Sequence, residues 1–140
     1  KGFKRPEEIM LGKKYLKDPN LFKFPENKIG EPTAVLIRSS VFNKIGFFRK
    51  DLFQLLDVEF WYRIMKYYKV GFVNEELVYF RLHENQATKK NILKGVNDYN
   101  EFYHIFYHEY LKFLHPIVQW KLIWKVTRLR KLQRLFKNAI

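Results

Sequence analysis

The sequence predicts a helix-rich α/β fold, with a short mixed sheet in its first part followed by C-terminal helices. Short apolar and β-branched runs bounded by glycine and proline precede residue 90, as is typical of short strands. After residue 90, aromatic residues recur every three or four positions, which indicates helix. The chain has 140 residues, of which 47% are hydrophobic and 19% aromatic, enough for a core. We expect residues 1–90 to form the α/β part and residues 91–140 a helical extension.

The first signals along the chain predict a helix and then a loop. Pro6, followed by two glutamates, is typical of a first helical turn, and this helix should end near Asp18. Residues 19–32 contain three prolines and a glycine, so we expect a loop there.

The middle of the chain alternates strand and helix signals. The apolar run from Thr33 to Arg38 predicts a buried strand. A brief helix should follow, capped by Ser39 or Ser40 and stopped at Gly46. A longer helix should run from about Asp57 to Lys69. Two short strands, 71–73 and 77–81, should then form a hairpin.

Asp57 and Glu59 lie where the longer helix should begin. Acidic residues are common in a first helical turn because the helix dipole and the unpaired N–H groups favour negative charge there. Taken alone, the pair therefore has a structural interpretation.

Three segments, in this order and at this spacing, resemble the second, acceptor-side half of a family 2 (GT-A type) glycosyltransferase domain. They read Gly-Glu-Pro-Thr-Ala-Val-Leu-Ile-Arg (30–38), Leu-Leu-Asp-Val-Glu-Phe-Trp-Tyr-Arg-Ile (55–64) and Tyr-Phe-Arg-Leu-His-Glu-Asn-Gln-Ala-Thr (79–88). The resemblance covers about residues 28–90 and implies a nucleotide-sugar-dependent, inverting enzyme. Its products would belong to polysaccharide biosynthesis.

The resemblance assigns roles in the acceptor site to the helix that begins near Asp57. Asp57 matches the aspartate that faces the acceptor, and a carboxylate there can remove the proton of the attacking hydroxyl. Glu59 and Arg63 match the acidic residue and the arginine that follow it. Leu56 departs from the pattern, because the family often has glutamate at that position. Trp61 could stack on an acceptor sugar, although core packing is the alternative at this spacing.

The resemblance also implies a donor-side role for Arg81 and His83. They match the Arg-x-His element that lies close to the donor diphosphate, so both could contact phosphate. His83 could also ligate the divalent metal, Mg or Mn, of the complete enzyme. The alternative for His83 is a hydrogen-bonded structural residue, which is common for a lone histidine at a strand end.

The sequence lacks the features that would hold the donor. It contains no Asp-x-Asp and no Gly-x-Gly-x-x-Gly, and it begins without a Met. We therefore expect part of a longer polypeptide, inactive alone, whose missing half binds the nucleotide-sugar. Its acceptor would be a glycan or a lipid-linked glycan, and it would work in the cytoplasm or peripherally on the inner face of the membrane.

The C-terminal end concentrates positive charge. The net charge is +13, and residues 110–140 hold eight basic residues and no acidic one. A helix should run from Ile117 to Lys137, with apolar residues along one face and two tryptophans beside it: Val118, Leu122, Val126, Leu129, Leu132, Phe136, Trp120 and Trp124. This face could lie in a membrane interface or pack onto the rest of the chain.

Two other functions remain open at this point. The chain could be a non-enzymatic basic module that binds an anionic membrane or nucleic acid through residues 117–140. The nucleic-acid version depends on charge alone, since no recognised nucleic-acid motif is present. Alternatively, the aromatic helix before Pro116 could mediate contacts with another protein.

Overall fold

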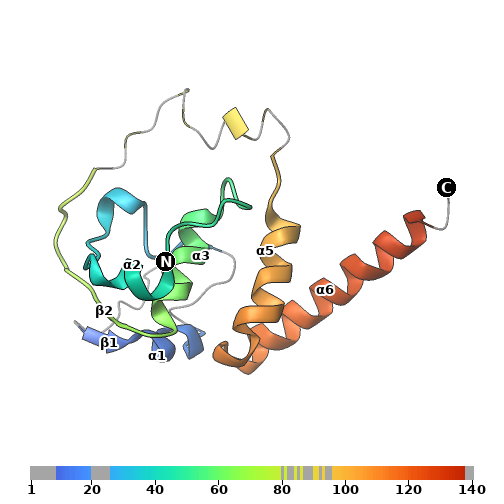
Figure 1. The fold of residues 1–140 in the computed structure, drawn as a ribbon, viewed down its shortest axis with the longest axis horizontal. Coiled ribbons are helices and arrows are strands. Elements are labelled where there is room, and N and C mark those ends of the chain that lie inside the picture. Colours follow the sequence, from blue (N-terminus) through green and yellow to red (C-terminus); the bar gives the residue numbers. More distant parts are fainter. Residues whose placement is uncertain are drawn as a thin grey trace.

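The computed structural model describes residues 9–19, 26–79, 81, 84, 86, 90, 91, 93 and 96–137, with side chains of the last helix placed as far as Lys131. Within these residues the fold is helix-rich, with five α-helices and one antiparallel sheet of two short strands (Figure 1). The helices are α1 (Gly12–Lys17), α2 (Ser40–Ile45), α3 (Leu56–Met65), α5 (Tyr99–Ile105) and α6 (Pro116–Lys137); the strands are β1 (Ile9–Leu11) and β2 (Lys69–Gly71).

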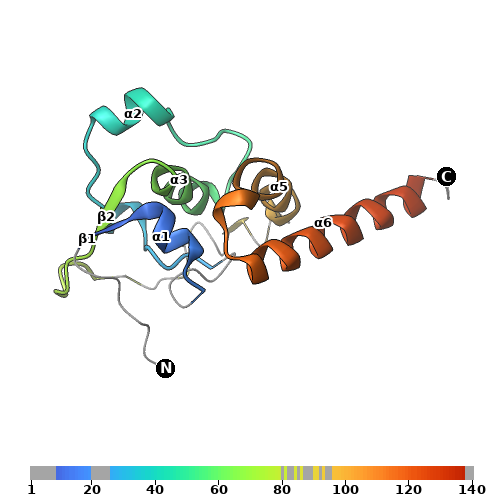
Figure 2. The same cartoon turned by 90° about the horizontal axis from the view of Figure 1, so that it is seen from below.

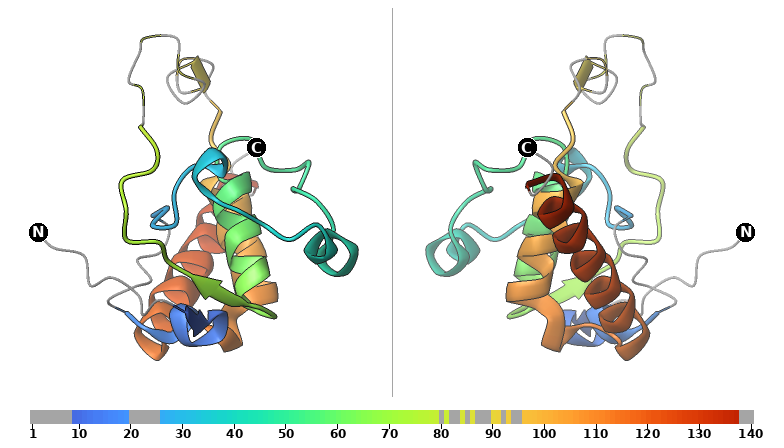
Figure 3. Two further views of the ribbon diagram at one scale, coloured as in Figure 1. Left: turned by 90° about the vertical axis from the view of Figure 1, so that its left-hand side faces the viewer. Right: turned by 90° about the vertical axis from the view of Figure 1, so that its right-hand side faces the viewer.

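Helix α3 is the centre of the fold. Its side chains are buried on nearly all sides, which is typical of a helix surrounded by other elements: Val58, Glu59, Phe60, Trp61, Tyr62 and Met65. Helices α1 and α2 both pack against it. On another side, the Tyr62 ring meets the Phe106 ring edge-on, with centroids 5.3 Å apart. The early and late parts of the chain therefore share one hydrophobic core. Figure 3 shows α6 lying across α5, on which it packs.

The sheet differs from the one that the sequence predicts. Strand β1 pairs antiparallel with β2, with Met10 opposite Val70. The expectation of a helix through residues 9–11 was therefore wrong. In β1 only the middle side chain, Met10, is buried, and this alternation suits an edge strand.

The strand predicted for Thr33–Arg38 is not formed. Pro32 begins a single 3₁₀ turn, η1 (Pro32–Ala34), and residues 35–38 are irregular. Val35 has extended backbone angles, φ −123° and ψ 126°. Extended backbone becomes a strand only beside a hydrogen-bonding partner, and among the described residues the only sheet joins β1 and β2.

The prediction of a hairpin formed by strands 71–73 and 77–81 was also wrong within the described residues. Helix α3 ends at Met65, before the predicted Lys69, and the N–H groups of Tyr67 and Tyr68 both bond to the Ile64 carbonyl at 3.0 Å. The chain then pairs as β2 at residues 69–71, while residues 77–79 are irregular and exposed. Hydrogen bonding to β1 places the strand two residues earlier than composition suggested.

The brief helix predicted after Ser39 is confirmed as α2, but the predicted serine cap was wrong, because no side-chain hydrogen bond caps its start. The helix stops at Gly46, its C-cap, which has a positive φ of 73°. This angle lies in the left-handed region, where glycine meets no steric cost.

The C-terminal half confirms the aromatic packing stripe. Helix α5 continues into a π-helical turn, η2 (Phe106–Tyr110), and a 3₁₀ turn, η3 (Leu111–Phe113). Phe106 is stacked between Phe102 and Tyr110, with centroids 4.4 and 4.3 Å away. Helix α6 begins at Pro116, where the sequence predicts the interruption, and it packs on α5, η2 and η3. Figure 2 shows its C-terminal half extending beyond the other helices.

Within the described part of the chain, no helix is both long enough and apolar enough to cross a lipid bilayer.

At Gly12, the backbone of α1 lies in direct contact with the backbone at the C-terminal end of α3. Its N–H donates to the Tyr68 carbonyl at 3.0 Å. A Cβ at this position would lie 2.4 Å from the Met65 carbonyl oxygen and 2.7 Å from the Tyr68 carbonyl oxygen. Neither atom belongs to a flexible side chain, so the helix backbones must separate to accept it.

We predict that Gly12→Ala lowers the free energy of unfolding by about 1–3 kcal/mol through overpacking. Urea unfolding followed by circular dichroism measures the loss. The control is Lys17→Ala, an exposed position on the same helix, which should change stability by less than about 0.5 kcal/mol. Equal stability of the two variants would show that α1 can move away from α3 without cost.

Candidate functional site

Asp57 lies in the first turn of α3, as predicted, and its side chain is half-buried. Its Oδ1 accepts a hydrogen bond from the Val58 N–H at 2.7 Å, and its Oδ2 accepts one from Asn27 Nδ2 at 3.0 Å. The carboxylate is therefore held by one backbone and one side-chain donor at the edge of the core. It is neither sealed in the interior nor placed in the middle of the helix.

Asn27 organises the loop that covers this end of α3. Its Oδ1 accepts the N–H groups of Ile29 and Gly30 at 3.1 and 3.0 Å, which closes a tight turn. Gly30 completes the turn with a φ of 116°, in the region that favours glycine.

Two aromatic residues of α3 fix the same loop. Trp61 Nε1 donates to the Gly30 carbonyl at 3.1 Å, and the Tyr62 hydroxyl donates to the Glu26 carbonyl at 3.0 Å. The loop of residues 26–31 is thereby bound to the helix that carries Asp57. Its Asn27 side chain is held in position to reach the carboxylate.

The environment raises the pKa of Asp57 above its ordinary value. Burial is the largest cause, and the negative charge of Glu31 acts in the same direction, while the Val58 N–H and Asn27 partly oppose them. A carboxylate with a raised pKa holds a proton more tightly than an ordinary aspartate. It is therefore a better proton acceptor for a hydroxyl group.

Asp98 fixes the segment that leads into α3. Its Oδ2 accepts the backbone N–H groups of Phe53, Gln54 and Leu55 at 2.8, 2.8 and 3.2 Å. Burial alone would raise the pKa of Asp98, but the three donors outweigh burial and the pKa lies below its ordinary value. One carboxylate thus binds three successive amides and sets where α3 begins.

Glu59 points into the core, in contrast to Asp57. Its side chain is 0% exposed. The Tyr110 hydroxyl donates to its Oε1, and Arg63 Nη2 forms an ion pair with its Oε2 at 2.9 Å. Glu59 is therefore occupied by internal partners and lies away from the surface that an acceptor could reach.

Arg63 is equally committed to the fold. It donates to the carbonyl groups of Ile45 and Phe47, both at 2.8 Å. Ile45 is the last residue of α2 and Phe47 follows it, and carbonyl groups at a helix C-terminus have no helical partners. Arg63 therefore connects α3 to the end of α2.

Trp61, which could have stacked on a sugar, is 3% exposed. Its ring packs against Phe60 and Phe48, with centroids 5.7 and 6.2 Å away. This burial supports core packing as the role of Trp61, in preference to stacking on an acceptor sugar.

The donor-side residues are only partly described. Arg81 is exposed, and its carbonyl accepts a hydrogen bond from Gln86 Nε2 at 3.1 Å. His83 lies outside the described residues. Among the described residues, no group of three His, Cys, Asp or Glu side chains is arranged to hold a metal ion. The described residues therefore do not supply the metal site that the resemblance implies.

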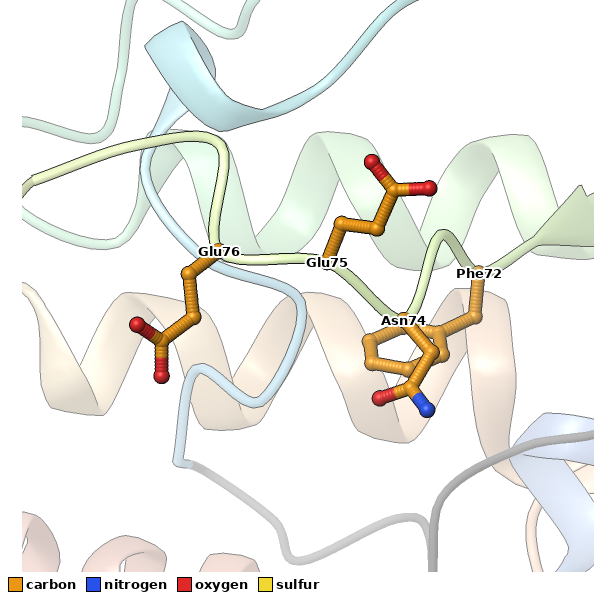
Figure 4. Close-up of a pocket in the computed structure, with 4 residues that line it drawn as sticks. All are labelled: Phe72, Asn74, Glu75 and Glu76. Atoms are coloured by element: carbon orange, nitrogen blue, oxygen red, sulfur yellow. The ribbon is translucent and has the colours of Figure 1, made fainter.

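A shallow hollow lies apart from the predicted site residues. It has a volume of about 280 Å³ and is lined by Phe72, Asn74, Glu75 and Glu76 (Figure 4). Figure 4 shows the Glu75 carboxylate on the opposite side of the chain from that of Glu76. The two carboxylates do not converge on one point, so the hollow offers no cation site.

Sequence reasoning missed three residues that position the site: Asn27, Asp98 and Tyr110 in its hydrogen-bonding role. Asn27 had a local signal, since asparagine three residues before glycine favours a turn. Asp98 directly precedes α5, a common place for aspartate. Neither signal reveals the distant partner, which lies 30 residues away for Asn27.

Comparison with known proteins gives one partial relationship. A 75-residue segment is 44% identical to the uncharacterized protein MT1568 of Mycobacterium tuberculosis (strain CDC 1551 / Oshkosh), covering 49% of this chain and 23% of that protein. The chain thus matches less than a quarter of the length of that relative. No protein-family model and no solved structure matches the chain.

We predict that Tyr110→Phe lowers the free energy of unfolding by about 1.5–3 kcal/mol, because it removes a donor from a buried carboxylate. A double-mutant cycle with Glu59→Gln, measured by urea unfolding, should give a coupling energy of about 0.5–3 kcal/mol. The control Tyr79→Phe removes a hydroxyl from a side chain that is 92% exposed and should cost less than about 0.5 kcal/mol. Additive effects of the two core substitutions would contradict the bond.

We also predict that Asp98→Asn destabilises the fold by about 1–3 kcal/mol at neutral pH. Because the folded-state pKa is depressed, the stabilisation is present above the unfolded-state value of about 4 and is lost as pH falls through the folded-state pKa. Unfolding free energies of the two proteins should therefore converge below about pH 4. The control is Glu101→Gln, an exposed substitution in the first turn of α5, the helix that follows Asp98. It should lower the free energy of unfolding by less than about 1 kcal/mol. A constant difference between Asp98→Asn and the unchanged protein at all pH values would contradict the charged interaction.

Proposed function

We propose that this chain is the acceptor-side part of an inverting, nucleotide-sugar-dependent glycosyltransferase resembling family 2. The observation that carries the proposal is Asp57 in the first turn of α3, half-buried, with a raised pKa and with Asn27 bonded to its Oδ2. The order and spacing of the motif-bearing segments across residues 30–88 support it.

The proposed reaction needs one protein carboxylate on the acceptor side. The Asp57 carboxylate accepts the proton of an acceptor hydroxyl while that oxygen attacks the anomeric carbon. The bond between the anomeric carbon and the diphosphate oxygen breaks, and the nucleoside diphosphate leaves with the electron pair. Attack from the opposite side inverts the configuration. This differs from glycoside hydrolysis, in which two carboxylates act across the bond.

The contacts of Asp57 fit this role. Asn27 donates to Oδ2 and orients the carboxyl group, while the nearby charge of Glu31 favours the protonated product of the transfer. Glu59 and Arg63 act behind it as positioning residues, because they hold α3 through buried contacts. Trp61 contributes by binding the loop that carries Asn27.

In this proposal the donor and a divalent metal, Mg or Mn, are held chiefly by a part of the enzyme outside this chain. Arg81 and His83 would face the donor diphosphate from this side. No step above depends on the metal, since the described residues do not form its site.

In an enzyme that joins this chain to its donor-binding part, Asp57→Asn should lower the turnover number by about 10²- to 10⁴-fold. The substitution removes the proton acceptor and keeps the shape, so donor affinity and thermal stability should change little. Because the pKa of Asp57 is raised, activity of the unchanged enzyme should fall on the acid side at a higher pH than an ordinary aspartate would give.

The matched control is Asp51→Asn, an exposed aspartate whose partner is Arg49. It should retain the turnover and the pH profile of the unchanged enzyme. Undiminished transfer by folded Asp57→Asn, measured with a nucleotide-sugar and a glycan acceptor, would assign the base to another residue and overturn the proposal.

A further inference from the structure

Helix α6 has two apolar faces, and only one is used for packing. Leu122 and Val126 are each 1% exposed and belong to the hydrophobic core. On the opposite side, Ile117, Trp120 and Trp124 are 56%, 67% and 54% exposed. These positions are spaced i, i+3 and i+7, so they form one stripe along the helix.

Basic side chains flank this exposed stripe. Lys121, Arg128 and Lys131 are all exposed, and the Arg128 guanidinium lies 5.3 Å from the Trp124 ring. We call the surface formed by Ile117, Trp120, Trp124, Lys121, Arg128 and Lys131 the tryptophan face. Other basic residues of α6 are used internally: Lys125 and Arg130 lie 5.3 Å from the rings of Tyr103 and Tyr107.

The position of α6 leaves the tryptophan face accessible to a flat surface. The packed side of the helix rests on α5, η2 and η3. Figures 1 and 2 both show the C-terminal half of the helix extending past the other described elements. Ile117, Trp120 and Trp124 are each more than half exposed, so a planar partner could reach them.

We propose that the tryptophan face docks on an anionic membrane surface. Tryptophan favours the boundary between lipid head groups and acyl chains, and a helix with bulky apolar residues and flanking lysine or arginine lies in that boundary. The stretch from residue 110 to 140 has eight basic residues and no acidic one, so its charge complements anionic head groups. This inference depends on α6 alone and is independent of the proposed sugar transfer.

The charge disfavours a second copy of the chain as the occupant. Two tryptophan faces in contact would bring two all-basic segments together with no acidic partner from residue 110 onward. Single-stranded nucleic acid is bound in basic grooves whose aromatic rings stack on bases. The tryptophan face lies instead on the exposed side of a single helix, opposite the buried Leu122 and Val126.

The test measures binding of the full chain to vesicles of phosphatidylcholine with and without phosphatidylglycerol. We expect sedimentation with the anionic vesicles and a blue shift of tryptophan fluorescence. Trp61 is already buried at 3% exposure, so the shift reports Trp120 and Trp124. Paired substitution of Trp120→Gln and Trp124→Gln should weaken binding by more than about tenfold. The melting temperature should stay unchanged, because both side chains are exposed.

Charge is tested separately with two variants that have the same net charge as each other. Replacing Lys121, Arg128 and Lys131 by Gln should weaken binding about fivefold for each charge removed, or about 100-fold together. The control replaces Lys17, Lys50 and Lys69, which are exposed outside α6, and should retain most of the binding. A second control, Phe53→Ser with Tyr79→Ser, removes exposed aromatic residues elsewhere and should leave binding unchanged.

Equal binding by the two charge variants, or full binding by the double tryptophan variant, would overturn the proposal. Oligomers that dissociate on tryptophan substitution, without vesicle binding, would assign the face to a second copy. Tryptophan-dependent binding of a single-stranded oligonucleotide without vesicle binding would assign it to nucleic acid. Either result also overturns the membrane proposal. None of these outcomes bears on the role of Asp57.

Discussion

The packing of this fold depends on the hydrogen bond and the ion pair that the buried carboxylate of Glu59 forms. Glu59 lies on the central helix and is bonded to Arg63 on the same helix and to Tyr110 in the π-helical turn. Arg63 extends the connection to the carbonyl groups at the C-terminal end of α2, and the Lys66 ammonium lies 4.2 Å from the Tyr110 ring. An isolated buried charge is costly, so the burial of Glu59 depends on these partners keeping their geometry. The network therefore requires α2, α3 and η2 to assemble in one relative position.

The geometry of helix α3 directs the Asp57 and Glu59 side chains to different sides. Two residues along an α-helix correspond to about 200° of rotation, so neighbouring carboxylates of one motif face opposite directions. Glu59 enters the core, while Asp57 stays at its edge beneath the loop of residues 26–31. Asp98 holds the three amides before α3, and Asn27 holds the carboxylate itself. The proposed base thus owes its position to one residue before the helix in sequence and one residue after it.

Helix α6 packs onto the rest of the chain on one side and leaves apolar side chains exposed on the other. Leu122 and Val126 complete the core, which explains why the helix belongs to the fold. Its tryptophans lie on the other side, where packing does not need them. Removing the whole helix would therefore expose core residues of the remaining chain and remove the tryptophan face at the same time. Only substitutions on the outer side can separate surface binding from stability.

The sequence alone determined the elements whose signals are local. The start of α3 near the acidic pair, the end of α2 at Gly46, the aromatic packing of α5 and the start of α6 at Pro116 follow from the helix dipole, glycine and proline geometry, and helical periodicity. Tertiary structure decided the rest. Residues 9–11 became a strand because β2 provided hydrogen-bonding partners, and Val35 stayed unpaired among the described residues because the sheet lies elsewhere. It also decided which members of the predicted site face inward, since Glu59 and Tyr110 are 51 residues apart. Strand pairing and buried charge contacts depend on distant partners, and no local pattern specifies those.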